Sequence, residues 1–160
     1  MNYSLYTDGA YSRKHDEGAF AYIILNPELQ EIKSDAKKIS QETNNRAELK
    51  AILAGVHNLP EDAEYVEVLS DSKYALGTLF MGWKREKNTD LFEVWENVRK
   101  QHPNVKFHAH WIPGHHGNKF NEQCDKMCSG VLGYDCNKEF EKYKKYRRNV
   151  VLPGIPIFKQ

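Results

Sequence analysis

The sequence predicts an α/β fold in which helices pack on the faces of one mixed β-sheet. Two observations carry this prediction: three strand-like segments come first, and the hydrophobic period then changes to that of helices separated by single strands. With 160 residues and a mass of 18.6 kDa, the chain has the length of one domain with a sizeable core. The predicted order of elements is β-β-β-α-β-α-α-β-α.

Three strands are expected at the start of the chain. Residues 3–8 alternate between apolar and polar side chains, which indicates a strand. The continuous apolar run Ala19–Leu25 predicts a buried strand, and the Asn26-Pro27 pair that follows it predicts a turn. Residues 30–39 complete a predicted meander, with one charged face.

Helices and single strands are expected to alternate in the rest of the chain. Apolar residues recur at spacings of three and four from Ala47 to Leu59, which predicts an amphipathic helix ended by Pro60. The further expected elements are a strand at Tyr65–Leu69, a helix at Ser72–Phe80, a helix at Leu91–Lys100, a strand at Val105–Trp111 and a helix that begins at Asn121–Cys128. Residues 134–160 differ in character, with a charged helical stretch before an extended end broken by proline. We therefore assign residues 1–133 to one domain and residues 134–160 to a C-terminal extension that is not an independent domain.

Composition excludes several classes of protein. The formal net charge is +1, which argues against binding nucleic acid by bulk charge alone. The charge is unevenly placed, because residues 134–160 hold 7 Lys and Arg against 3 Asp and Glu, whereas residues 1–133 hold 16 against 19. The longest apolar run is too short to span a bilayer, and the N-terminus has no basic segment followed by an apolar one, as a secretory signal would. Three cysteines do not suggest a disulfide framework, so a cytoplasmic protein is expected.

Four carboxylates stand out as candidate metal ligands: Asp8, Glu48, Asp71 and Asp125. Each also has a local interpretation, namely a turn, a capping box, a helix cap and a solvated helix position, respectively. Asp8 and Asp71 are both expected at the carboxyl ends of strands, where sites form in open α/β sheets. A cluster of like charges is tolerable when divalent cations neutralise it. Ligand sets made only of oxygen favour Mg²⁺ or Mn²⁺, and two such ions suit an in-line phosphoryl displacement.

Four blocks of sequence resemble the type 1 ribonuclease H family. In chain order they are Tyr6-Thr7-Asp8-Gly9-Ala10, Thr43-Asn44-Asn45-Arg46-Ala47-Glu48-Leu49, Ser70-Asp71-Ser72-Lys73-Tyr74-Ala75-Leu76, and Trp111-Ile112-Pro113-Gly114-His115-His116-Gly117 followed by Asn121-Glu122-Gln123-Cys124-Asp125. The resemblance covers about residues 3–130, with one acid of the set in each block. It implies a five-stranded mixed sheet of order 3-2-1-4-5 with helices on both faces. It also implies an endonuclease that cuts the RNA strand of RNA/DNA hybrids with two Mg²⁺ ions, leaving 5′-phosphate and 3′-hydroxyl ends. We expect the protein to be a monomer.

The resemblance implies roles for particular residues. Asp8, Glu48, Asp71 and Asp125 would bind the metal ions. Glu122 would assist metal exchange and product release, and His115 would assist proton transfer or product departure. Thr43, Asn44 and Asn45 would contact the phosphate backbone and the minor groove, which suits recognition of groove shape and 2′-hydroxyl groups. We add Lys73, Trp83 and Lys84 as candidate substrate contacts, because ammonium groups suit phosphates and an indole ring can stack on sugar or base.

The chain departs from the family pattern in three places. The loop Arg13–Gly18 lacks the usual Asn-Pro-Gly, Lys73 stands where many members have Gln, and the segment Met81–Thr89 replaces a longer basic protrusion. The cations and aromatics of Tyr143–Arg148 suit phosphate and stacking contacts, so we predict that the extension partly substitutes for the protrusion. The alternative is a solvated helix followed by an arm that packs on the body.

Other functions remain open at this point. A nuclease of the same fold with a double-stranded RNA or DNA substrate is one, and a catalytically idle hybrid-binding module is another. A zinc site built from the histidines and cysteines near the last strand is conceivable, although the spacing does not match a zinc finger; the residues are His108, His110, His115, His116, Cys124 and Cys128.

Overall fold

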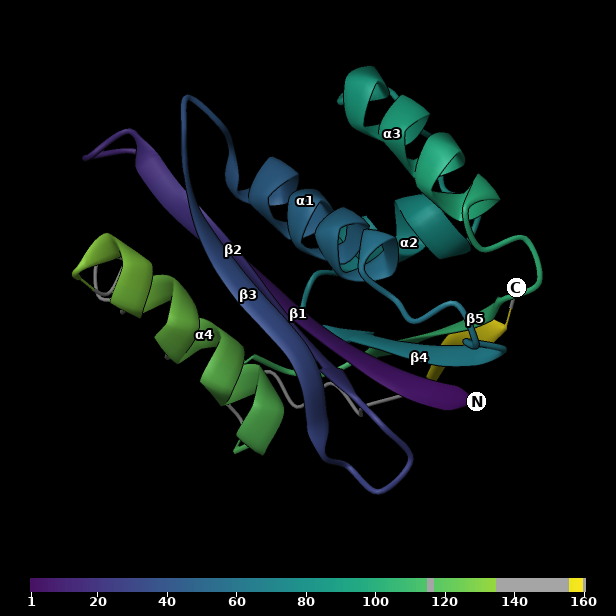
Figure 1. Ribbon diagram of the computed structural model, residues 1–160. Helices are drawn as coiled ribbons and strands as arrows, with labels where there is room; N and C mark the ends of the chain where they lie inside the picture. The colour runs from purple at the N-terminus through teal and green to yellow at the C-terminus, as the bar shows by residue number, and fades with distance from the viewer. Residues whose placement is uncertain (115–116, 135–155, 160) are drawn as a thin grey trace.

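The computed structural model of the chain describes residues 1–114, 117–134 and 156–159. Its sheet has the strand order β3-β2-β1-β4-β5-β6. The strands β1 (Asn2–Ser12), β2 (Glu17–Leu25) and β3 (Glu31–Ser40) form an antiparallel meander. The strand β4 (Tyr65–Ser70) pairs in parallel with β1, and β5 (Lys106–Trp111) pairs in parallel with β4 (Figure 1). The predicted mixed sheet with the order 3-2-1-4-5 is confirmed.

A sixth strand extends the sheet beyond the five that the sequence predicted. The strand β6 (Pro156–Lys159) pairs antiparallel with β5, so that Lys159 lies opposite His108. An exposed edge strand presents unpaired backbone N–H and C=O groups, and pairing with β6 covers the part of this edge from His108 to His110. Residues 156–159 are therefore part of the sheet, whereas residues 135–155, which lead to them, lie outside the described residues.

Helices cover both faces of the sheet, as expected (Figure 1). The helices α1 (Asn44–His57), α2 (Lys73–Phe80) and α3 (Thr89–Lys100) lie on one face, and α4 (Lys119–Leu132) lies on the other. The larger apolar core lies between the sheet and α1–α3 and includes the completely buried Trp95. A smaller core joins β2 to α4 through the buried Cys124 and Cys128. None of the helices formed by the described residues has the length and apolarity that a membrane crossing needs.

The helix boundaries follow from local side-chain caps. The hydroxyl of Thr43 accepts a hydrogen bond from the backbone N–H of Arg46, and the hydroxyl of Ser72 accepts one from Ala75. The α4 helix begins before the predicted Asn121, because the side chain of Asn118 caps it.

Candidate active site

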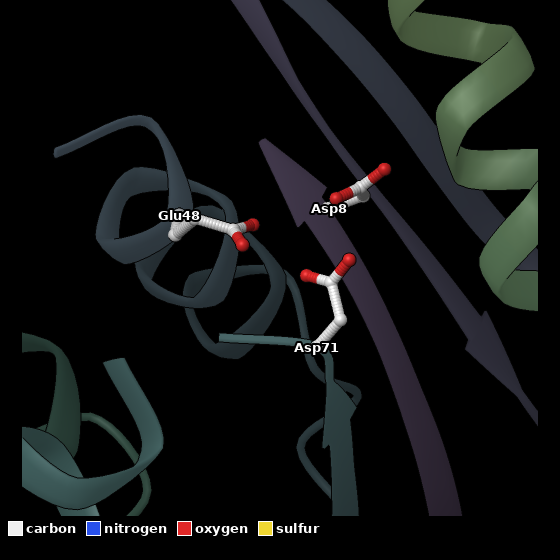
Figure 2. Close-up of side chains that lie close together, drawn as sticks. All are labelled: Asp8, Glu48 and Asp71. Carbon is white, nitrogen blue, oxygen red and sulfur yellow. The ribbon is translucent and has the colours of Figure 1, made fainter. Parts of the chain in front are cut away.

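Three of the four predicted acids lie together in the folded chain. Asp8 comes from β1, Glu48 from α1, and Asp71 from the residue that follows β4. One oxygen from each carboxyl group lies within 4.8 Å of the other two. Figure 2 shows the three side chains pointing toward a common space between the two strands and the helix.

The position of Asp8 differs from the prediction. We expected it at the carboxyl end of the first strand, but β1 continues four residues further, to Ser12, as the partner of β2. The parallel pairing with β4 ends earlier, at Tyr6 opposite Leu69. Beyond this point one edge of β1 is free of β4, and the Asp8 side chain lies just past the last parallel pair. A turn at Asp8-Gly9 is therefore wrong, because both residues belong to a continuous strand.

Glu48 reaches Asp8 because α1 and β1 approach each other closely at Gly9. A Cβ atom on Gly9 would lie 2.5–2.7 Å from backbone atoms of Ala47 and Glu48, which is closer than real Cβ atoms come. The capping-box interpretation of Glu48 is wrong, since Thr43 is the N-cap of α1 and Glu48 lies in the next turn. Glu48 is held by backbone packing, with its side chain 6% exposed.

Asp71 is held by the end of β5, which sequence reasoning had not linked to it. The indole N–H of Trp111 donates a hydrogen bond of 3.0 Å to the backbone carbonyl of Asp71. A Cβ atom on Gly114 would lie 2.5 Å from an Asp71 carboxylate oxygen. The helix-cap interpretation of Asp71 is also wrong, because Ser72 caps α2. The sequence offered only one indication of these contacts, which is that Trp111 and Gly114 lie in the same short block as His115.

The electrostatics of the cluster are those of crowded like charges. Burial raises the pKa of the Glu48 carboxyl well above its usual range, and the negative charges of Asp71 and Asp8 raise it further. The Oε1 atom of Glu48 is buried and has no hydrogen-bond partner among the described residues. An orphaned carboxylate oxygen among three oxygen ligands fits a hard divalent cation.

The two acids predicted on the last helix, Asp125 and Glu122, are not members of this cluster. Asp125 on α4 is half-buried, and it is not part of the group within 4.8 Å. The Cys124 thiol, which directly precedes Asp125, donates to the Tyr6 carbonyl of β1 at 3.7 Å. Burial raises the pKa of this thiol, and the charges of Asp8, Asp71, Glu48 and Asp125 raise it further. Glu122 is half-buried in the first turn of α4. His115 lies outside the described residues.

The candidate substrate contacts lie on the exposed surface. Thr43, Asn44 and Asn45 are exposed at the start of α1. Lys73 begins α2, and its Nζ lies 4.6 Å from the centroid of the Trp111 ring. Beyond α2, the Trp83 side chain is 44% exposed, and the Lys84 ammonium, also exposed, pairs with Glu86 at 3.0 Å.

The zinc alternative finds no support in the part of the chain that the structure describes. There the only cluster of three or more possible metal ligands is that of Asp8, Glu48 and Asp71. His108 contacts the ring of Tyr65, and His110 lies 3.7 Å from a carboxylate oxygen of Glu67. Cys124 and Cys128 are free thiols buried against β1 and β2.

Comparisons with known proteins agree over most of the chain. The family model described as RNase H matches residues 1–132. A protein named Ribonuclease H from Trichodesmium erythraeum is 35% identical over 138 residues, covering 78% of this chain and 84% of the relative. Ribonuclease HI from Synechocystis is 29% identical over 159 residues, covering 89% and 95% of the two chains. The crystal structure of RNase H1 from the archaeon Halobacterium salinarum has a TM-score of 0.68 at 19% identity, covers 83% of this chain and 98% of its own, and shows the same fold.

Proposed function

Because the chain belongs to the ribonuclease H family of nucleases, we propose that it is an endoribonuclease that hydrolyses the RNA strand of RNA/DNA hybrids. The observation that carries the proposal is the convergence of Asp8, Glu48 and Asp71 from three separate elements. A protein that only bound hybrids would have no use for a buried cluster of like charges. The same cluster would serve a nuclease that binds divalent cations.

The three carboxylates would hold divalent metal, with Asp125 as the fourth ligand. The oxygen-only donor set supports Mg²⁺, with Mn²⁺ as a substitute. Two bound ions would activate a water molecule and stabilise the leaving oxygen of an in-line displacement, which leaves 5′-phosphate and 3′-hydroxyl ends. The burial of Glu48 and the close packing at Gly9 and Gly114 would keep the ligands in one geometry through the reaction.

Surface residues on α1 and α2 would bind the hybrid. The exposed Thr43, Asn44 and Asn45 surround the N-terminus of α1, where backbone N–H groups favour phosphate. Their short polar side chains suit a groove recognised by shape and by 2′-hydroxyl groups. Lys73, Trp83 and Lys84 would contact the phosphates and sugars of the other strand.

Two further residues have proposed roles in turnover. We assign Glu122 to metal exchange and product release, since it is half-buried one helical turn before Asp125. We assign His115 to proton transfer or product departure, on the resemblance alone. We also propose that the enzyme is a cytoplasmic monomer, and the free thiols of Cys124 and Cys128 are consistent with a reducing compartment.

Cleavage of matched substrates tests the proposal. We expect the full chain to cut a labelled RNA/DNA hybrid in Mg²⁺, to leave double-stranded RNA and double-stranded DNA of the same sequence intact, and to stop cutting in EDTA. The measurement is gel analysis of product lengths and of end groups after phosphatase treatment. Preferential cutting of either duplex would assign a different substrate, and binding of the hybrid in Mg²⁺ without cutting would identify a binding module.

We propose in addition that residues 134–160 form a basic extension of the catalytic domain and strengthen hybrid binding. A variant that keeps the chain length and the residues of β6 is preferable to a truncation, because β6 pairs with β5. We therefore suggest four glutamine substitutions in the extension, at Lys144, Lys145, Arg147 and Arg148. If these cations neutralise phosphates, the log–log salt slope of hybrid affinity should become shallower by about 0.9 for each phosphate that the variant no longer neutralises. An unchanged affinity and slope would show that these four cations do not neutralise phosphates of the hybrid.

A further inference from the structure

We propose that Arg46 is a positioning residue that fixes the short cationic segment Met81–Asn88 relative to the substrate-contacting start of α1. The inference rests on the proposed function, because it concerns how this chain presents its hybrid-binding surface. Arg46 directly follows Asn45, and its bond to Asp90 links α1 to the N-terminus of α3.

The guanidinium of Arg46 is almost completely occupied by partners within the protein. Its Nη1 and Nη2 atoms donate to the two oxygens of Asp90 at 2.9 and 2.8 Å. Nη1 also donates to the Asn88 side-chain oxygen at 3.3 Å, and Nε donates to Glu42. A guanidinium has five N–H donors, so four are used. Arg46 therefore has little capacity left for a phosphate and acts through the residues that it holds.

Asn88 connects this arginine to a third helix. It precedes α3 in a left-handed conformation with φ of 63°, and its side chain makes no cap bond to that helix. Instead, its amide N–H donates to the Tyr74 hydroxyl on α2 at 2.9 Å while its oxygen accepts from Arg46. Asn and Asp side chains commonly cap helices. The Asn88 side chain instead links α1, α2 and α3.

The segment before Asn88 is folded back on α2. The backbone N–H of Trp83 donates to the Gly77 carbonyl at 3.1 Å, and the indole ring lies so close to Gly77 that a Cβ atom there would clash with it. The Arg85 Nε donates to the Thr78 carbonyl at 2.9 Å. One end of the segment is thus anchored on α2, and the other end is anchored through Asn88 to Arg46. The exposed Trp83 and Lys84 are thereby placed at a set distance from Thr43–Asn45.

The pair of Arg46 and Asp90 is charged throughout the range in which the enzyme would work. A hydrogen bond and the positive charge of Arg46 lower the pKa of Asp90 to about 2. The pairing is bidentate, a geometry that a lysine ammonium cannot reproduce. Arg46→Lys keeps the positive charge but removes the two parallel N–H donors of the guanidinium. The variant therefore separates the effect of the bidentate geometry from that of electrostatic attraction for the hybrid.

Three variants of the full chain test the inference: Arg46→Lys, Asp90→Asn and Asn88→Gly. Asn88→Gly keeps the left-handed backbone and removes only the side-chain links. We expect each to raise KM for an RNA/DNA hybrid about five- to tenfold while kcat at saturating Mg²⁺ changes less than about twofold. Hybrid affinity measured by anisotropy in EDTA should weaken by the same factor. The double variant Arg46→Lys with Asp90→Asn should be no worse than the more affected single variant, because both substitutions remove the same bidentate pair.

A core variant separates positioning from general stability. Val66 lies in β4 with its side chain fully buried, so Val66→Ala should lower the melting temperature without changing KM at a temperature well below it. Unchanged KM and hybrid affinity in the three variants would overturn the inference while wild-type cleavage still supports the proposed function. A fall in kcat with KM unchanged would also overturn it, because the network would then serve the acids. A wild-type chain that neither binds nor cuts the hybrid would overturn both.

Discussion

Asp71→Asn is expected to fold normally and to lose RNA/DNA hybrid cleavage by about 10³-fold or more in kcat. Asparagine keeps the shape of the side chain but replaces a charged carboxylate with a neutral amide, which is a poorer ligand for a hard divalent cation. The backbone of Asp71 should stay in place, because the Trp111 indole binds its carbonyl oxygen and not its side chain. The loss should therefore reflect the chemistry of the carboxylate alone.

Single-turnover cleavage of a labelled hybrid across a Mg²⁺ titration measures this effect. Asp35→Asn is the matched control, because Asp35 is an exposed acid on β3 and its substitution makes the same change in net charge. Asp35→Asn should cleave like the wild type. Wild-type cleavage by Asp71→Asn would remove Asp71 from the proposed metal site.

Although Asp71→Asn should reduce cleavage, it should increase the free energy of unfolding of the metal-free protein. Burial, together with the charges of Asp71 and Asp8, raises the pKa of Glu48 above its ordinary value of 4.5, so the folded state binds this proton more tightly than the unfolded state. That contribution is fully present below the ordinary pKa and is lost as the pH rises through the raised pKa. In EDTA, the free energy of unfolding of the wild type should therefore fall as the pH rises from 4.5 toward neutrality.

Removing the charge at position 71 should flatten this pH dependence. In EDTA at neutral pH, we expect Asp71→Asn to be more stable than the wild type, because the variant lacks one of the negative charges that raise the pKa of Glu48. Addition of Mg²⁺ should raise the melting temperature of the wild type more than that of the variant, since only a well-bound ligand shifts unfolding strongly. Thermal unfolding from pH 5 to 8, with and without Mg²⁺, measures both effects. A variant less stable than the wild type in EDTA would show that the carboxylates do not repel each other in the folded state.

Gly9→Ala is expected to damage both stability and catalysis. The added methyl group would lie 2.5–2.7 Å from backbone atoms of Ala47 and Glu48, and backbone atoms cannot move aside as the end of a side chain can. The strand β1 and the helix α1 must then separate, at a cost of about 1–3 kcal/mol in the free energy of unfolding. Because Glu48 lies at this contact, its carboxyl group should move away from Asp8, and kcat should fall at temperatures where the variant is still folded.

Gly130→Ala is the matched control for this prediction. Gly130 lies in α4, and a Cβ atom there would meet nothing within 4 Å. Alanine should stabilise the helix by up to about 1 kcal/mol and leave cleavage unchanged. Chemical unfolding and hybrid cleavage of the two variants provide the comparison. If Gly9→Ala matched the wild type in both measurements, close packing of β1 on α1 would not be what positions Glu48.

Much of the fold was predictable, because it depends on patterns that lie next to each other in the chain. The apolar run Ala19–Leu25 and the spacing of three and four from Ala47 to Leu59 each indicate one element without reference to the rest. The residue at which a strand ends depends less on its neighbours in the chain and more on its pairing partner. The strand β1 continues past Asp8 because β2 pairs with it as far as Ser12, and nothing in residues 3–8 shows that partner.

The same distinction between local patterns and long-range contacts applies to the candidate site. The four acids could be named from the sequence, since each lies in a block with its own pattern, and three of the four meet in the structure. The residues that hold them could not be named, because their contacts join distant parts of the chain. Trp111 reaches Asp71, and Gly9 receives the backbone of Glu48, over separations of about 40 residues.

The net charge of +1 is a property of the sequence alone, whereas the positions of the charged groups in space are a property of the tertiary structure. By itself, the sequence determined the order of the elements, the family, the candidate acids and the uneven placement of charge along the chain. Only the tertiary structure decided that Glu48 is buried beside Asp8 and Asp71, that Arg46 joins α1 to α3, and that β6 completes the sheet. The physical reason is range: helix and strand patterns arise between near neighbours, whereas a raised pKa, a close backbone contact and a bidentate ion pair require groups that only folding brings together.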